Sequence, residues 1–345
     1  MCKFGIKNYW NFLLKKYFSS IDVDTYFIEE YVKLYEKEDE KAVCFYYVKD
    51  EFCFIFPFLK REFIVNGEKY YDFETAYGYG GPLWNIEDRI KIIEALDCLK
   101  ELCIKQKYVA GFVRFHPMVN NQIYFDRIAT VLPERKTIDI ELKDSIENIW
   151  MHEIHTKNRN VIKKGLKTGL KFHLDNNFEH LDDFIEIYNT TMGKLQAEDF
   201  YYFDRLYYNK FASSVPGAFL AYVTLEKKII ASALFFHSKS FGHYHLAGSN
   251  IEYHKYSPNN FLLWNVAIEM KNRGIKRFHL GGGTNSDEKN SLYAFKSRFS
   301  KHQNQFYIGK LIFNQIIYSQ LCKDYEEKSP QKAELFKHRL LKYKY

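Results

Sequence analysis

The sequence predicts a mixed α/β (α+β) protein made of two similar domains. The chain has 345 residues, of which 46% are hydrophobic and 27% charged, so it can bury the cores of two ordinary domains. Short runs with strand-like composition alternate with longer runs that have helical spacing. The order of hairpin, helix and strand occurs twice, which is expected when two similar α/β domains follow each other.

The first half of the chain contains one such set of elements. In chain order we expect strands at 43–48 and 52–59, a glycine-rich loop at 76–84, a helix at 86–107 and a strand at 108–117. Ile90, Ile93, Leu96 and Leu99 share one side of the expected helix. Pro117 stops the strand that follows, because proline cannot donate to a sheet.

The second half repeats this order. We expect helical structure at 181–212, a strand meander at 217–250, a helix at 261–274 and a strand at 275–283. Gly274 is a typical residue just after a helix end. A strand at 136–142 leads to Asp144 and Ser145, a typical helix start, so we expect the domain boundary between 140 and 150.

Composition and charge limit the class of protein. The net charge of +7 fits a protein that meets anions but is not a dedicated nucleic-acid binder. The six cysteines form no CxxC pair, which predicts reduced thiols in a cytoplasmic protein. The first residues, 1–18, lack the pattern of a signal peptide, and no run is long enough to span a membrane. The amphipathic first helix leaves open a contact with a membrane surface.

A basic stripe is expected on a helix over 157–169. Arg159, Lys163 and Lys167 recur every four residues and therefore share one face. A solvated surface is one interpretation of this stripe. The other is a contact for the phosphates of RNA or of a nucleotide-linked substrate. The residues alone favour neither.

A second constellation lies at 243–264. His243 and His245 point to the same face of a strand, but no third ligand has a clear place, so we expect no metal site. Asn260 lies in the first turn of the helix that follows. Its segment, which includes Pro258, either only caps the helix or also presents the helix start to a phosphate or carbonyl.

A third constellation lies at 278–299. Neither GxxxxGK[ST] nor GxGxxG is present, so Gly282 and Gly283 predict a tight turn at a strand end, where α/β folds place ligands. Lys296 follows among aromatic residues. A partly buried lysine there could donate to a developing oxyanion. No GxSxG motif is present, and covalent catalysis is not supported.

Seven segments together resemble the FemABX family. They are AYGYGGPLW (76–84), RFHPM (114–118), RNVIKKGLKTGL (159–170), GSNIEY (248–253), SPNNFLLW (257–264), RGIKRFHLGGG (273–283) and YAFKSRF (293–299). The resemblance covers most of the chain. It is most specific over 243–299, where four motifs keep their order and spacing.

The resemblance implies a fold and an activity. It implies two tandem acyl-CoA N-acyltransferase-like (GNAT) domains, each a mixed sheet flanked by helices, over 1–145 and 146–345. Family members transfer an amino acid from aminoacyl-tRNA to a peptidoglycan precursor. The expected partners are therefore aminoacyl-tRNA and a nucleotide- or lipid-linked cell-envelope precursor, and no cofactor is expected.

The resemblance also assigns residues. Lys296 matches the family lysine that stabilises the transition state, and Tyr253 matches a tyrosine that contacts the acceptor. His116 stands where some relatives carry an acidic residue, and a histidine there can act as a base. The remaining substrate-binding candidates are Ser249, Asn250, Asn260, Arg159, Lys163, Tyr202, His245, Gly282 and Gly283.

Two other functions stay open. One is an acyl-CoA-dependent N-acyltransferase that acts on an amino sugar, because one fold can host several activities. Such enzymes carry a [RQ]xxGx[GA] phosphate loop after the central strand, where this chain has SNIEYHKYSPNN (249–260) without glycine. The other is a protein that binds RNA or a glycan without catalysis.

Overall fold

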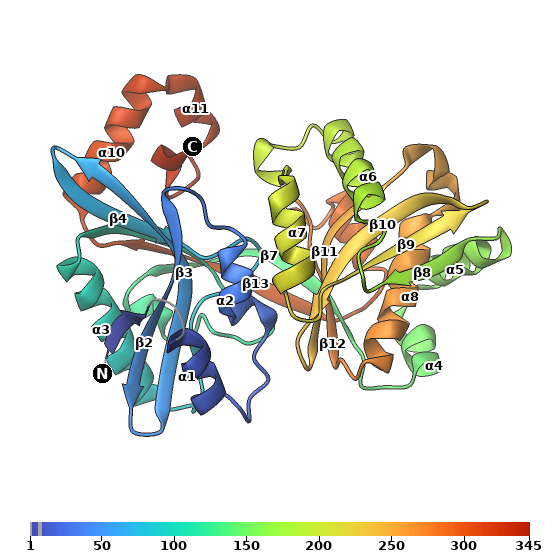
Figure 1. The fold of residues 1–345 in the computed structure, drawn as a ribbon, viewed down its shortest axis with the longest axis horizontal. Coiled ribbons are helices and arrows are strands. Elements are labelled where there is room, and N and C mark those ends of the chain that lie inside the picture. Colours follow the sequence, from blue (N-terminus) through green and yellow to red (C-terminus); the bar gives the residue numbers. More distant parts are fainter. Residues whose placement is uncertain (1, 6–8) are drawn as a thin grey trace. The chain divides into compact units, whose positions relative to one another are not determined.

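The computed structural model describes residues 2–5 and 9–345 and divides into two compact units (Figure 1). Unit 1 comprises Met1–Ile21, Tyr26–Glu134 and Gln305–Tyr345, and unit 2 comprises Asp22–Thr25 and Arg135–Asn304. These units differ from the expected ranges 1–145 and 146–345. The main segment of unit 1 ends at Glu134, and the last segment, Gln305–Tyr345, packs with unit 1.

Unit 1 is a mixed sheet flanked by helices. Its strands follow the order β1-β2-β3-β4-β6-β13, and β5 pairs with β3. The strand bounds are β1 Cys2–Gly5, β2 Glu40–Lys49, β3 Phe52–Val65, β4 Glu68–Glu74, β5 Leu83–Trp84, β6 Tyr108–Arg114 and β13 Gln303–Ile312. Only β4 and β6 pair in parallel among these neighbours. A parallel pair needs a crossover, and the crossover contains helix α3.

Helix α3 shows how the sequence folds locally. The helical elements of unit 1 are α1 Tyr9–Tyr17, η1 Thr25–Phe27 (whose Thr25 falls in unit 2), α2 Glu29–Lys33, α3 Arg89–Lys105, η2 Phe125–Arg127, α10 Gln315–Lys328, α11 Pro330–Leu335 and η6 Lys342–Lys344. The Asp88 side chain accepts from two N–H groups and caps α3. Its buried side contains Ile92, Leu96 and Leu99. Ile90, which we expected on that side, is 72% exposed, so the predicted stripe was partly wrong.

Unit 2 is also a mixed sheet. Its order is β7-β12-β11-β10-β9-β8, and β7 belongs to this unit from Arg135 onward. The strand bounds are β7 Thr130–Glu141, β8 Lys171–Asp175, β9 Phe219–Leu225, β10 Lys228–His237, β11 Phe241–Ser249 and β12 Arg277–Gly282. Strands β11 and β12 are parallel and the other neighbours antiparallel. The predicted order of hairpin, helix and strand thus occurs in both units, and in each unit the strand after the helix pairs in parallel with a strand that precedes the helix.

Helices cover both faces of this sheet (Figure 1). They are α4 Ile146–Asn148, the π-helical turn η3 Ile149–Glu153, α5 Thr156–Lys167, α6 Leu181–Lys194, η4 Asp199–Tyr201, α7 Arg205–Ser214, η5 Ile251–Tyr256, α8 Pro258–Asn272 and α9 Ser291–Lys296. Helix α6 packs on β10 and β11, and α8 packs on β8 to β11. Gly248 faces α6, because a Cβ there would lie 2.8 Å from the α6 backbone.

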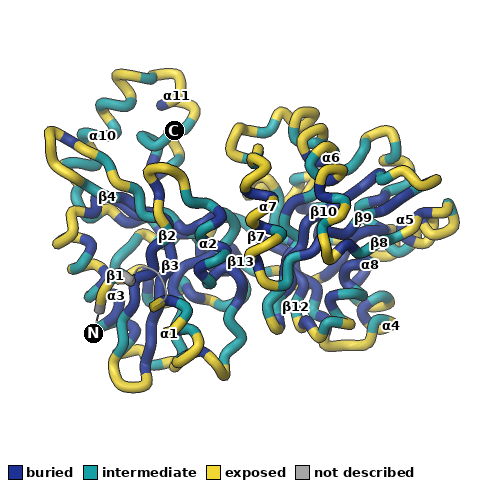
Figure 2. Tube along the Cα trace, viewed as in Figure 1, coloured by how far each residue is buried: buried dark blue, intermediate teal, exposed yellow. Residues whose placement is uncertain are grey.

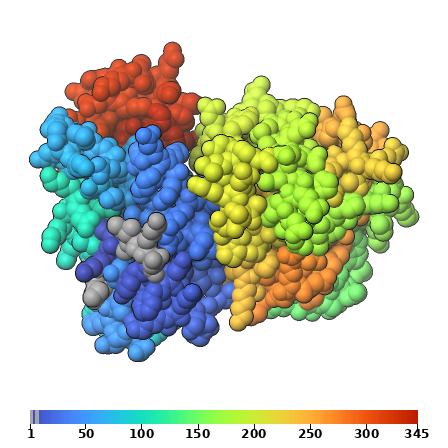
Figure 3. Space-filling model, viewed as in Figure 1, coloured from blue at the N-terminus to red at the C-terminus, as the bar shows by residue number. Residues whose placement is uncertain are grey.

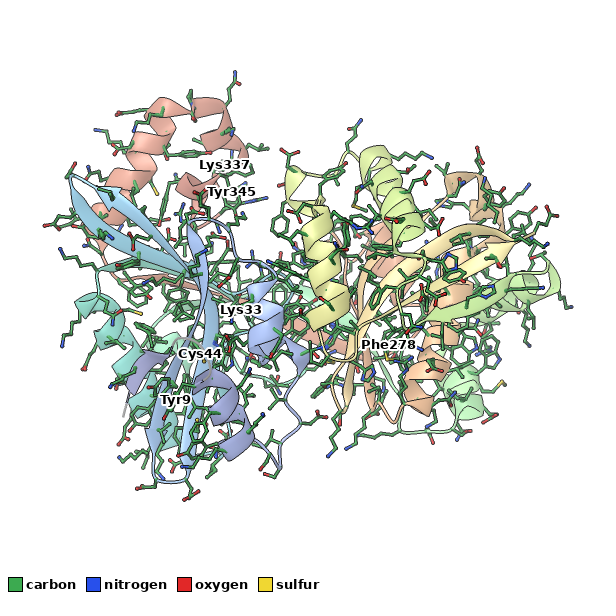
Figure 4. All side chains as sticks on the ribbon, in the orientation of Figure 1. Tyr9, Lys33, Cys44, Phe278, Lys337 and Tyr345 are labelled. Carbon is green, nitrogen blue, oxygen red and sulfur yellow. The ribbon has the colours of Figure 1, made fainter. Side chains whose placement is uncertain are left out.

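The core of unit 2 lies between the sheet and α8. Figure 2 shows buried strands beneath helices whose outer sides are exposed, and Figure 4 shows Phe278 inside this core. Alternate residues of β9, Ala221 and Val223, belong to the core. Tyr222 and Thr224 therefore point to the α6 face.

Two further expectations concern the cell compartment. In the described part of the chain, no helix combines the length and hydropathy that a membrane crossing requires. The thiols of Cys44, Cys53, Cys103 and Cys322 are free. Cys98 is disulfide-bonded, which contradicts the expectation of reduced thiols throughout. The membrane-surface contact of α1 stays a prediction.

Candidate acyl-transfer site

The two central strands of unit 2 separate partway along their length. Strands β11 and β12 pair only at Phe241↔Arg277, Gly242↔Phe278 and His243↔His279. Beyond this point β11 stays bonded to β10, and β12 stays bonded to β7. Beyond His243 and His279, β11 and β12 no longer pair with each other, although both lie in the middle of the sheet. Backbone groups there need other partners, which an extended ligand can supply.

Lys296 lies beside this separation. Its Nζ donates to the Gly282 carbonyl at the end of β12, at 2.9 Å. The same atom lies 5.8 Å from the ring centroid of Tyr244, which directly follows the last paired residue of β11. Helix α9 carries the lysine and begins at Asn290, whose side chain accepts from the N–H groups of Leu292 and Tyr293. The lysine head group is thus held between the two diverging strands.

Burial changes the acidity of this lysine. The side chain is 8% exposed, and desolvation lowers its pKa to about 7, with a smaller contribution from the positive charge of Arg135. At neutral pH both the ammonium and the neutral amine are therefore populated. A group of this kind can donate to a negative oxygen or take a proton.

The glycines before α9 do not form the predicted tight turn, because Gly281 and Gly282 are the last two residues of β12 and Gly283 directly follows the strand. Gly281 has a φ of 78°, which favours glycine. A Cβ at Gly282 would lie 2.7 Å from the Lys136 carbonyl oxygen, and one at Gly283 would lie 2.7 Å from Asn290 Oδ1. Arg135 donates to the Gly283 carbonyl at 2.7 Å. These contacts fix the carbonyl that holds Lys296.

In the loop between β11 and α8, several backbone N–H groups are hydrogen-bonded to acceptors in the same loop. Asn250 accepts from the N–H of Glu252 through Oδ1 and from that of Tyr253 through its carbonyl. The Ser257 N–H bonds to the His254 carbonyl, and the N–H of Asn260 bonds to the Ser257 carbonyl. These four donors are occupied and are therefore not available to a phosphate.

Polar side chains connect this loop to its surroundings. Ser249 Oγ lies 3.0 Å from His254 Nε2 and accepts from Asn259 Nδ2 at 3.1 Å. The Tyr253 ring lies 5.2 Å below the Lys228 ammonium. Ser249, Asn250 and Tyr253 thus lie together at the end of β11, and their roles as substrate contacts stay predictions.

Asn260 connects three elements. It donates to Asn158 of α5 at 2.7 Å, and Asn158 in turn donates to the Arg298 carbonyl just after α9. Asn158 is buried, so this bridge fixes α5, α8 and the lysine-bearing helix to one another. Asn158 was not among the residues expected from the sequence to form the site.

The predicted basic stripe of α5 is different in the structure. Arg159 donates to the carbonyls of Trp150, Met151 and Ile154, so it closes the π-helical turn η3. The exposed lysines of α5 are Lys157, Lys163, Lys164 and Lys167. No described carboxylate forms an ion pair with them. They form a continuous cationic face, which we call the α5 lysine face.

The remaining candidates lie apart from Lys296. His245 forms a 2.6 Å hydrogen bond with the Tyr207 hydroxyl and stacks on Phe211 of α7. Burial lowers the pKa of His245 to about 3, and His243 adds to this, so the ring is neutral. Tyr202 is 42% exposed and follows η4. Their roles as substrate contacts stay predictions.

His116 belongs to unit 1. It is fully buried, and its Nδ1 accepts the N–H of Met118 at 3.2 Å. Rings of Tyr26 and Phe27 lie within 5.8 Å of the imidazole. An accepting Nδ1 places the hydrogen of the neutral ring on Nε2. The role of His116 as a base stays a prediction.

Comparison with known proteins identifies the fold. Residues 155–297 match the family described as acetyltransferase (GNAT) domain. No curated protein sequence matches the chain. The crystal structure of FemX has a TM-score of 0.72 at 14% identity, over 93% of this chain and 99% of that one.

Two further solved structures are similar to this chain. The C-terminal domain of a putative lysylphosphatidylglycerol synthetase from Agrobacterium fabrum has a TM-score of 0.55 at 13% identity, over 86% of this chain and 90% of that one. L-PGS from Bacillus licheniformis has a TM-score of 0.53 at 13% identity, over 80% and 85%. At such identities the likeness shows the fold alone. The chain therefore has the two-unit GNAT-type fold of FemX, and residues 155–297 form an acyltransferase domain of the GNAT class.

Proposed function

We propose that the protein transfers an aminoacyl group from aminoacyl-tRNA to an amine of a cell-envelope precursor, peptidoglycan or a related glycan or peptide. The observation that carries this proposal is the loop between β11 and α8. Its N–H groups at Glu252, Tyr253 and Ser257 are bonded within the loop, so these groups are not available to the pyrophosphate of an acyl-CoA. The α5 lysine face supports an RNA donor, because no described carboxylate neutralises its charges and exposed lysines bind phosphates. A cytoplasmic location belongs to the same proposal.

The chemistry would be aminolysis of an ester. The acceptor amine loses a proton and attacks the ester carbonyl carbon, and a C–N bond forms. The bond between that carbon and the ribose oxygen breaks, and the ribose oxygen takes a proton. Lys296 would donate to the carbonyl oxygen as it becomes negative. The separated edges of β11 and β12 would align donor and acceptor, which supplies part of the rate.

The second candidate is an acyl-CoA-dependent N-acyltransferase acting on an amino sugar. The match of residues 155–297 to an acetyltransferase (GNAT) domain favours it. A donor test separates the two. The protein is incubated with nucleotide-linked cell-wall precursors and either mixed aminoacyl-tRNA or acetyl-CoA, and mass spectrometry follows the acceptors.

We expect an aminoacyl-sized mass gain that disappears after RNase treatment. A triple variant, Lys163→Gln with Lys164→Gln and Lys167→Gln, should reduce the slope of log affinity for RNA against log salt by about two, at ~0.7 per phosphate contact. The matched control replaces Lys100, Lys105 and Lys328 of unit 1 and should leave the slope unchanged. An acetyl-sized gain from acetyl-CoA alone would replace this proposal with the second candidate. RNA or glycan binding without turnover of either donor would indicate a non-catalytic protein.

The pH dependence tests the state of Lys296. We expect the ratio of the wild-type kcat to that of Lys296→Met to fall as pH rises through about 7. The lowered pKa means that the ammonium prevails below this pH and the neutral amine above it, and the ammonium is the stronger donor to a negative oxygen. The ratio cancels the ionisation of the acceptor amine. A ratio that rises with pH would make Lys296 the base instead.

A further inference from the structure

A groove lies on the α6 face of the unit 2 sheet, away from Lys296. Its volume is about 940 Å³, and its lining comes from β8, β9, the β9–β10 turn, α6, the end of β11 and η5. Figure 3 shows α6 and α7, in green and yellow, at the surface of this unit. Tyr222 and Thr224 of the groove point to the α6 face, whereas Tyr244 beside Lys296 packs on the core under α8. The groove is therefore on the opposite face from Lys296.

The floor of the groove is aromatic and polar. The rings of His173 and Tyr222 stack at 4.8 Å and 12°, and the His180 ring approaches Tyr222 edge-on at 4.6 Å. His173 Nε2 lies 3.0 Å from the Thr224 hydroxyl. Ring faces beside hydroxyl groups are suited to a polar ligand with a flat or sugar-like body.

One end of the groove is acidic. Helix α6 places Asp183 and Glu186 three residues apart, so both line the groove next to Tyr222. Asp183 bonds His180 at 2.9 Å, and no described cation forms an ion pair with Glu186. The neighbouring imidazole of His173 has a pKa lowered by burial and by Lys171 and His180, so it adds little positive charge here. This end attracts a cation.

The other end is basic. Lys171 is paired in register with Thr224, and the β9–β10 turn adds Lys227 and Lys228. Lys194 lies at the end of α6, near the point where Thr191 bonds Ser249. Glu226 and Glu252 offset part of this charge, so four lysines face two carboxylates. The groove thus has a negative end and a positive end.

We propose that this groove binds a ligand that carries both a protonated amine and an anionic group, phosphate or carboxylate. The amine lies toward Asp183 and Glu186, the anion lies toward Lys171 and the turn lysines, and the ligand body lies on Tyr222. The polarity of the groove rejects ligands of one charge sign, because they would meet like charge at one end. The groove shares Ser249 and Asn250 with the predicted substrate contacts, but Lys296 is not part of its lining, so the groove exists whichever acyl donor the protein uses.

The test is direct binding by calorimetry with two sets of probes. Glucosamine 6-phosphate carries both groups, whereas N-acetylglucosamine 6-phosphate lacks the amine and glucosamine lacks the phosphate. In the second set, Nα-acetyl-lysine carries both groups, whereas its amide lacks the carboxylate and diacetyl-lysine lacks the amine. We expect the probe with both groups to bind about fivefold or more tightly than either analogue, as two charge pairs in a partly exposed groove allow.

Variants then assign the two ends. Glu186→Gln should abolish the higher affinity for glucosamine 6-phosphate than for N-acetylglucosamine 6-phosphate. Lys171→Gln should abolish the higher affinity for glucosamine 6-phosphate than for glucosamine. Both residues are exposed, and the matched controls Glu147→Gln and Lys210→Gln change exposed residues outside the groove. Lys296→Met should bind the probes like the wild type.

The outcomes are distinct. A preference in the first set indicates a sugar phosphate, and one in the second set indicates a peptide or amino acid. If neither doubly charged probe binds better than its analogues, or if the groove variants behave like their controls, the proposal is wrong. The donor test above can fail without affecting this result.

Discussion

Replacement of Lys296 by methionine is expected to lower kcat for acyl transfer by about 100- to 1,000-fold, the usual loss when one oxyanion donor is removed. The reason is geometric. Lys296 Nζ is held at 2.9 Å from the Gly282 carbonyl, between strands whose facing edges are unpaired. Methionine keeps the length of the buried chain but cannot donate. Single-turnover kinetics, with the donor that the donor test identifies, would measure the rate of the chemical step.

The matched control is Lys289→Met, because Lys289 is exposed in the loop that leads into α9. It should retain the wild-type rate. Donor affinity should change little in Lys296→Met, since the lost interaction forms mainly in the transition state. A variant that keeps full kcat would exclude Lys296 from the chemistry. A variant that loses its near-ultraviolet circular dichroism would be replaced by Lys296→Gln.

The order of strands and helices could be predicted because each element depends mainly on the hydrophobic pattern and the turn residues of its own segment. The meander 217–250 and the helix after it were expected from alternation and from Gly274, and β9, β10, β11 and α8 confirm them. The glycine segment 281–283 and Lys296 were connected in the sequence because they are close along the chain. Their hydrogen bond spans only fourteen residues.

Contacts between distant segments could not be predicted in this way. The residues Gln305–Tyr345 return to unit 1, where Leu340 and Leu341 pack with Val109 and Lys344 pairs with Glu40 and Glu74. Arg159 looked like part of a surface stripe, but the π-helical turn needs a donor for its carbonyls. The spacing of residues along the sequence identifies neither the contacts of the last segment with unit 1 nor the contacts of Arg159 with the π-helical turn.

The site itself was predictable only in part. Tyr244 lies between two histidines that drew attention for metal binding, and strand alternation alone turns it to the opposite face. Its place beside Lys296 depends on where β11 leaves β12, which is a property of pairing and not of either strand's sequence. The groove on α6 depends in the same way on packing between elements.

Replacement of Phe278 by alanine is expected to lower the free energy of unfolding of unit 2 by about 3–5 kcal/mol, as for other fully buried phenylalanines. Phe278 is 0% exposed, lies opposite Gly242 in the short parallel ladder, and contacts the Phe235 ring at 6.1 Å (Figure 4). Glycine on the partner strand cannot fill the cavity. The loss of stability should therefore be largest in the segment where β11 and β12 pair with each other.

Hydrogen exchange can locate this effect, because unfolding of a chain with two units need not be two-state. Amides of β11 and β12 should exchange faster in Phe278→Ala, whereas those of β2 and β3 should not change. Leu166→Ala is the control, since Leu166 is 66% exposed on α5 and alanine is an equally good helix former. Phe278→Leu keeps part of the volume and should give a smaller change. Unchanged exchange in β11 and β12 would mean that pairing with β7 and β10 alone holds the strands, and that the point where they separate does not depend on the core.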